Sequence, residues 1–191
     1  MELISVLDNP LTEEYLSLKQ YSLGKEISWF YHETTGSVFT QEEKERDIPL
    51  WGHHVMVRPN RLVDRPYTTI TSNLFESAYK VISQIFSSNG IEAHVIYRLN
   101  INMTCGGDNK TTPWHKDLEF PHTNMIVYLN KFSDGWTYVR DGDVEEKHTP
   151  KEDGIIIFDG ELEHCHAVTK PHERRIVMVV NYLRNNKVCV I

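Results

Sequence analysis

Two residues of metal-binding type stand two positions apart in the segment 112–120, TPWHKDLEF. In an extended chain the side chains of residues i and i+2 point to the same side. His115 and Asp117 would therefore project together, and Trp114 and Lys116 would face the other way. Because such pairs also arise by chance on protein surfaces, this pair predicts a metal site only if the chain supplies a third ligand.

Candidates for that ligand occur in the segment 154–183, GIIIFDGELEHCHAVTKPHERRIVMVVNYL. His164 and His166 would share one face of an extended segment, and Arg175 opens the apolar run that follows. Two histidines and one carboxylate form the facial triad that binds iron and leaves positions open for oxygen chemistry. Neutral imidazoles with an ionised carboxylate also suit a divalent first-row metal.

Four segments between Tyr97 and Tyr182 share their order with the motifs of a known enzyme family. They are His115-Lys116-Asp117, Tyr128-Leu129-Asn130, SDGWTYV at 133–139, and His166-Ala167-Val168 with Arg175 nine residues after His166. In these segments the chain resembles the iron(II)- and 2-oxoglutarate-dependent dioxygenases, in particular the prolyl 4-hydroxylase-like branch. SDGWTYV is similar to the family's Gly-Gly-x-Thr strand, although Asp134 replaces the first glycine.

The resemblance implies a mainly β fold with flanking helices around a double-stranded β-helix, a jelly-roll or cupin-like core. It also implies that His115, Asp117 and His166 hold the metal, while Arg175 binds the distal carboxylate of 2-oxoglutarate with its planar guanidinium. His164 stands eleven residues before Arg175 and stays open as the alternative ligand or as a pocket residue.

Three further residues receive roles from the resemblance. Tyr128 is expected to donate its phenol hydrogen to the same carboxylate. Asn181 lies six residues after Arg175 on the same strand face, where it would contact the metal pocket or the cosubstrate, or serve as a buried amide. Tyr97 precedes the triad and is either a pocket tyrosine or part of the core.

The activity implied is hydroxylation of a C–H bond with Fe(II), 2-oxoglutarate and O2, with ascorbate as an optional reductant and with release of succinate and CO2. By analogy the substrate is a prolyl or other amino-acid side chain of a peptide or protein; the alternative is a small metabolite. A cupin-type metal protein that does not use 2-oxoglutarate could share the triad, but it would not need Arg175. A binding module with a degenerate site would lack a ligand, and none is missing.

Periodicity predicts the elements that must position these residues. Apolar residues recur at helical spacing from Ser72 to the SSNG sequence that ends at Gly90, which predicts one amphipathic helix. Alternation from Ile91 to Met103 predicts a long strand. Shorter β-like runs follow, separated by Gly, Asp, Asn or Pro, which favours antiparallel β structure.

The chain length of 191 residues favours one domain, with a support region at 1–90 and a catalytic core at 91–191. With 27 acidic and 20 basic residues the formal charge is −7, which disfavours nucleic acid as a partner. Three cysteines without CxxC spacing predict that the protein resides in the reducing interior of a cell. No leader and no apolar run of about 18 residues is found, so we expect a cytoplasmic protein without a membrane partner.

Overall fold

The computed structural model describes residues 2–35, 40–59, 67–107 and 111–184. Its helices are α1 (Glu13–Leu23), α2 (Gln41–Arg46) and α3 (Phe75–Ser88). Its strands are β1 (Ile4–Leu7), β2 (Phe30–His32), β3 (Leu50–Val57), β4 (Thr69–Ile70), β5 (Ala93–Cys105), β6 (Thr123–Tyr128), β7 (Thr137–Asp141), β8 (Val144–His148), β9 (Ile155–Asp159), β10 (Glu163–His166) and β11 (Arg174–Arg184).

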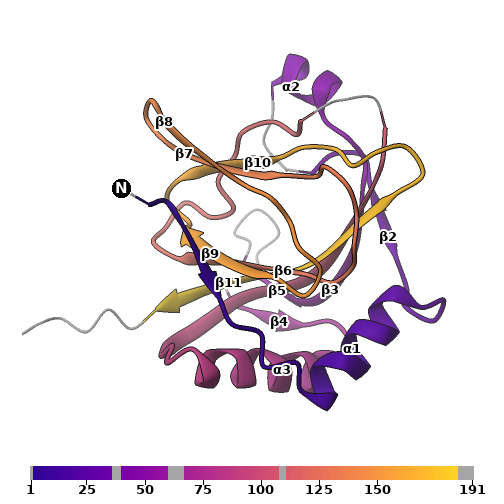
Figure 1. The fold of residues 1–191 in the computed structure, drawn as a ribbon, viewed down its shortest axis with the longest axis vertical. Helices are drawn as coiled ribbons and strands as arrows, with labels where there is room; N and C mark the ends of the chain where they lie inside the picture. Colours follow the sequence, from indigo (N-terminus) through magenta and orange to yellow (C-terminus); the bar gives the residue numbers. More distant parts are fainter. Residues whose placement is uncertain (1, 36–39, 60–66, 108–110, 185–191) are drawn as a thin grey trace, which may run out of the picture.

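The strands form two antiparallel sheets that face each other (Figure 1). The larger sheet has the order β1-β9-β6-β11-β5-β3-β2, with β4 paired to β3, and the smaller has the order β10-β7-β8. Strands from both sides of residue 90 therefore share one sheet. The fold class expected from the sequence, mainly β with flanking helices and a jelly-roll core, is confirmed.

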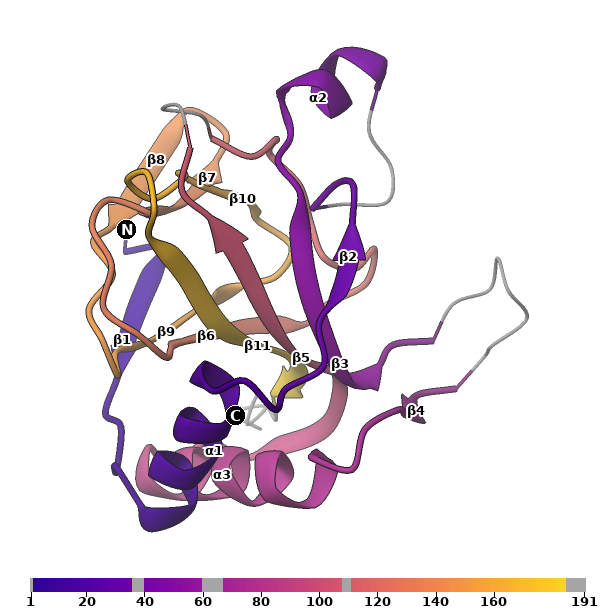
Figure 2. The same cartoon turned by 90° about the vertical axis from the view of Figure 1, so that its right-hand side faces the viewer.

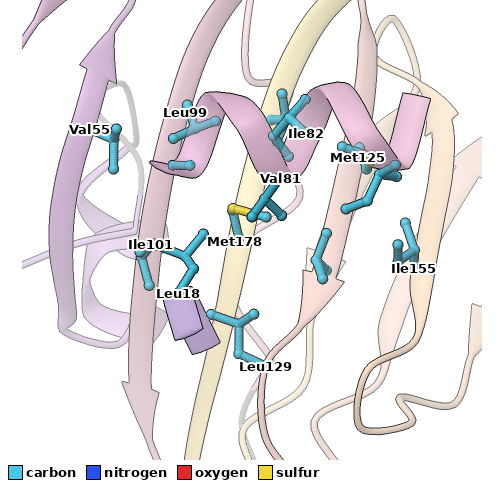
Figure 3. Close-up of a cluster of buried hydrophobic side chains, with 14 of the residues drawn as sticks. Leu18, Val55, Val81, Ile82, Leu99, Ile101, Met125, Leu129, Ile155 and Met178 are labelled. Carbon is cyan, nitrogen blue, oxygen red and sulfur yellow. The ribbon is translucent and has the colours of Figure 1, made fainter. Parts of the chain in front are cut away.

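Helices α1 and α3 cover one face of the larger sheet (Figure 2). Val81, Ile82 and Ile85 of α3 are fully buried, because their spacing places them on one side of the helix. They belong to one apolar core with Leu99 and Ile101 of β5, and Figure 3 shows this contact between helix and sheet. The opposite face of the sheet is thereby left to face the smaller sheet.

Strand β5 divides its residues between these two faces. Leu99, Ile101 and Met103 belong to the core under the helices. The alternate residues line a cavity between the sheets; they are Arg98, Asn100, Asn102 and Thr104. The alternation expected for a long strand is thus present, and its polar half faces inward between the sheets.

Some element boundaries differ from the sequence prediction. Helix α3 begins at Phe75 and not directly after Ser72. The Ser72 hydroxyl accepts a hydrogen bond from the Leu74 amide, so Ser72 lies ahead of the helix and does not cap it. The segment around His115 is not a regular strand; one isolated bridge, from His115 to His164, joins it to β10. No helix among the residues described is long and apolar enough to cross a membrane.

Candidate active site

His115, Asp117 and His164 form a cluster between the two sheets. The backbones of His115 and His164 exchange hydrogen bonds of 3.0 and 2.9 Å, so the two residues lie side by side on neighbouring segments. The Nε2 atom of His115 lies 4.0 Å from Oδ1 of Asp117, and Nε2 of His164 lies 4.0 Å from Oδ2. One ligand atom from each residue lies within 4.8 Å of the others, an arrangement that could hold a metal ion.

His166, the third ligand expected from the sequence, lies outside this cluster. Two residues of a strand advance a side chain by about 6–7 Å, so His166 is displaced along β10 from the position opposite His115. It pairs with Thr137 of β7, and its amide donates to the Thr112 hydroxyl at 3.0 Å. Its Nε2 atom is buried without a hydrogen-bond partner in the described part of the chain.

Two neighbours hold one oxygen of the Asp117 carboxylate. Arg98 Nη2 and Asn181 Nδ2 each lie 2.9 Å from Oδ2. Asn181 also donates to Asn124 on β6, so its amide is fixed from two sides. Asn181 is therefore a fully buried amide that contacts Asp117 of the candidate metal cluster.

The protonation states in the cluster suit metal binding. Burial by itself would raise the pKa of Asp117, but Arg98 and the neighbouring histidines hold that pKa well below its usual range. Burial, with His115 close by, lowers the pKa of His164 to about 3. Burial and nearby Arg175 likewise lower the pKa of His166. An ionised carboxylate and neutral imidazoles are the forms that bind a metal.

A second polar group surrounds Arg175 at the start of β11. Arg175 Nη2 lies 3.2 Å from the Thr137 hydroxyl, which lies 2.8 Å from the Tyr128 hydroxyl, and all three residues are buried. Within the described ranges no carboxylate forms an ion pair with Arg175, and its Nε atom has no partner. A buried cation without a counter-ion is costly, so this site suits a carboxylate ligand.

One cavity of about 1560 Å³ joins the two groups and extends to residues of β2 and β3, which also line it. His115, Asp117, His164 and His166 line it, and so do Arg175 and Thr137. Tyr128 reaches this site through Thr137. Tyr97 is not among the lining residues; its ring lies 4.9 Å from that of Phe120.

Two important side chains, Arg98 and Thr137, are not among the site residues expected from the sequence. Arg98 interrupts an otherwise apolar and amide-bearing strand, and a charge at an inward position of a central strand is the signal that could have identified it. Thr137 belongs to the SDGWTYV segment, and the structure makes it the link between Arg175 and Tyr128. Neither contact follows from spacing alone.

Comparison with known proteins bears on the fold of the chain. No family model matches the sequence, and no curated protein matches it. Among solved structures, an oxidoreductase of the 2OG-Fe(II) oxygenase family from Burkholderia pseudomallei is similar with a TM-score of 0.66 and 14% identity, covering 96% of this chain and 86% of that one. The chain has the fold of the 2-oxoglutarate and iron(II) oxygenases.

Two other structures with this fold differ in what they act on. A prolyl-4-hydroxylase from Pseudomonas putida has a TM-score of 0.57 and 13% identity, over 97% of this chain and 94% of its own. The epimerase SnoN, in complex with Fe3+, alpha ketoglutarate and nogalamycin RO, has a TM-score of 0.56 and 12% identity, over 95% of this chain and 79% of its own. The oxygenase fold thus accommodates substrates of different classes, and the resemblance seen in the sequence is confirmed as a likeness of fold.

Proposed function

We propose that the protein is an Fe(II)- and 2-oxoglutarate-dependent oxygenase that hydroxylates a C–H bond. The observation that carries this proposal is one cavity that holds both a histidine-carboxylate cluster and a buried arginine without a counter-ion. A metal protein that does not use 2-oxoglutarate would have no need of that arginine. The fold supports the same assignment.

The reaction balances with these components. One oxygen atom of O2 enters the new hydroxyl group and the other enters succinate, while 2-oxoglutarate loses CO2. The four electrons that reduce O2 come in equal parts from the C–H bond and from the oxidised 2-oxoglutarate. The iron, when bound, supplies the redox chemistry that joins these two oxidations.

The protein positions the metal and the cosubstrate and excludes water from the site. His115, Asp117 and a histidine of β10 would hold the metal, with Arg98 and Asn181 fixing the carboxylate. Arg175 and Thr137 would bind the distal carboxylate of 2-oxoglutarate, with Tyr128 holding the Thr137 hydroxyl in place. Burial of this second group strengthens its electrostatic interaction with the cosubstrate.

For the third ligand we favour His164, because its Nε2 atom is part of the cluster and it lies opposite His115. The spacing to Arg175 favours His166 instead. Anaerobic titration with Fe(II) and 2-oxoglutarate decides between them through the weak visible charge-transfer band of the complex. The band should disappear in His164→Ala, persist in His166→Ala and need much more 2-oxoglutarate in Arg175→Met.

The reverse pattern for the two histidines would restore the assignment made from the sequence. A band absent from the unaltered protein, or unchanged in all three variants, would refute the proposed function.

Sequence resemblance suggests a prolyl or other amino-acid side chain as the oxidised group, with ascorbate keeping the iron reduced. The similar structures include a prolyl hydroxylase from Trichoplax adhaerens in complex with a peptide as well as SnoN, so they do not select between peptide and small-molecule substrates. Succinate release with prolyl peptides, free amino acids and nucleosides is the direct test. If none of these compounds raises succinate release above the rate without substrate, the prolyl assignment is wrong, whereas the cofactor assignment is unaffected.

A further inference from the structure

Two histidines meet on the part of the cavity wall that β2 and β3 provide. Nε2 of His32 lies 3.0 Å from Nε2 of His54, and both side chains line the cavity. Their ring centroids are 5.1 Å apart, with an angle of 79° between the ring planes. Neither residue belongs to the candidate metal cluster, so the pair is a second place where imidazole nitrogens converge.

The two strands bring the rings together across Gly52. His54 lies two residues after Gly52 on β3, so both project to one face of the sheet. Gly52 lies opposite Phe30 on β2, which places His32, two residues after Phe30, on the same face. A Cβ atom at Gly52 would lie 3.4 Å from Nε2 of each histidine. The lack of a side chain at Gly52 therefore leaves the space in which the two nitrogens meet.

The preceding histidine of β3 shows how a structural histidine is held in this strand. The two ring nitrogens of His53 lie 2.8 Å from oxygen atoms, the Ser28 carbonyl and the Ser72 hydroxyl. His54 is held differently, because its Nε2 contacts a nitrogen of His32, and its Nδ1 is buried without a hydrogen-bond partner in the described part of the chain. A hydrogen bond between two imidazoles uses the lone pair of only one ring, whereas a shared metal ion uses both.

The separation of the two Nε2 atoms fits one shared ion. Two imidazole nitrogens about 2.1 Å from one ion lie about 3.0 Å apart if their bonds meet at a right angle, and about 3.4 Å apart at the tetrahedral angle. The observed 3.0 Å lies within this range. Without an ion the same distance is an ordinary hydrogen bond, so the pair can accept an ion with little movement.

The His54 ring is in the form that binds a metal. Burial lowers its pKa, and the nearby His32 and Arg98 add to this effect. A neutral imidazole offers its lone pair to a metal ion. Among the described residues no third histidine, cysteine or carboxylate joins the pair closely enough to complete a three-residue group. Water or a molecule in the cavity would therefore fill the other coordination positions.

We propose that His32 and His54 form a second metal site, which binds a divalent ion of the zinc and copper class through their two Nε2 atoms. Imidazole ligands suit these ions, and Cu(II) binds to them more tightly than Zn(II). The proposal goes beyond the oxygenase assignment and does not depend on it, since it uses neither the candidate metal cluster nor 2-oxoglutarate. The open positions of the ion would face the cavity.

The test is the number of Zn(II) ions that the full chain retains in equilibrium dialysis at micromolar free zinc. The unaltered protein should retain one ion more than His32→Asn and one ion more than His54→Asn, because each variant loses one of two ligands and at least tenfold in affinity. His94→Asn is the matched control. His94 is exposed on β5 and does not line the cavity, so this variant should retain as many ions as the unaltered protein.

NMR of the histidine nitrogens tests the site in the unaltered protein and does not depend on how well the variants fold. As Zn(II) is added, the Nε2 signals of His32 and His54 should shift together and saturate at one concentration. Signals that do not shift overturn the proposal. So does equal zinc retention by the unaltered protein, His32→Asn and His54→Asn, or a loss of the same size in His94→Asn. Failure of the iron and 2-oxoglutarate complex to form would refute the proposed function and leave these zinc results unchanged.

Discussion

At the residue scale, Asp117 is the most constrained group of the candidate site. Oδ2 lies 2.9 Å from both Arg98 Nη2 and Asn181 Nδ2, so two neighbours fix the orientation of a carboxylate that faces His115 and His164. Residues that orient metal ligands contribute strongly to affinity even though they do not touch the metal.

Asn181→Leu should weaken metal binding, because Oδ2 of Asp117 loses one of its two donors and the carboxylate is held less firmly. We expect about a tenfold or greater loss of affinity, measured by anaerobic titration with Co(II) and its visible absorption. Asn130→Leu is the control, since Asn130 bridges Arg174 and Ile176 by backbone contacts and lies outside the cavity. Equal affinity in the two variants would show that Asn181 has only a structural role.

Thr137 connects Arg175 with Tyr128, so Thr137→Val tests the cosubstrate site without removing its charge. The guanidinium and the phenol both lose a hydrogen-bond partner, and binding of 2-oxoglutarate should weaken by about 2- to 12-fold, the equivalent of one ordinary hydrogen bond. Arg175→Met should cost considerably more. Isothermal titration with 2-oxoglutarate measures both, and an unaffected Thr137→Val would remove this residue from the carboxylate site.

The sequence could place His115 and Asp117 together, because residues i and i+2 of an extended segment share a side. It favoured His166 over His164 only through the spacing to Arg175, because both histidines share a side of β10 for the same reason. The choice depends on which of them lies opposite His115, and this register is set by pairing between segments almost 50 residues apart. Spacing to Arg175 carries no information about that pairing.

At the element scale, the sequence could predict strands whose residues alternate between apolar and polar or are strongly apolar. It could not predict strands whose position depends on tertiary contacts. The run from Ile91 to Met103 predicted β5, and the apolar run before Asp159 predicted β9. Helix α1 buries only Tyr15, Leu18 and Ser22, too narrow a stripe for a clear helical pattern.

The end of β5 is held against the segment that leads into β11. The Gly106 amide donates to the Glu173 carbonyl at 2.7 Å, and a Cβ atom at Gly106 would overlap the carbonyl of Lys170. Gly106→Ala should therefore destabilise the fold by about 1–3 kcal/mol, since backbone must move to admit the methyl group. Gly107→Ala is the matched neighbour, because its Cβ would make only an ordinary contact with Val168. Urea unfolding compares the two, and equal stabilities would contradict the close approach.

At the scale of the whole molecule, the two faces of the larger sheet have different tasks. The face under α1 and α3 is apolar and supplies the burial that stabilises the fold. The face toward the smaller sheet carries the candidate metal cluster, the arginine site and the polar side chains of β5. The sequence could predict the apolar face from its alternation, whereas the cavity needs two sheets that come from distant segments.

Adjacent residues of β5 test this division. Ile101 is fully buried in the apolar core, so Ile101→Ala should lower the free energy of unfolding by about 2–5 kcal/mol. Asn102 faces the cavity with an unpartnered buried oxygen, so Asn102→Leu should change stability by less than about 1 kcal/mol, or raise it, because an unsatisfied polar atom is removed. Chemical denaturation of both variants gives the comparison. A loss of stability in Asn102→Leu as large as that in Ile101→Ala would mean that the polar side chains of β5 stabilise the fold. The inner face of the sheet would then not be a surface whose stability was given up for binding.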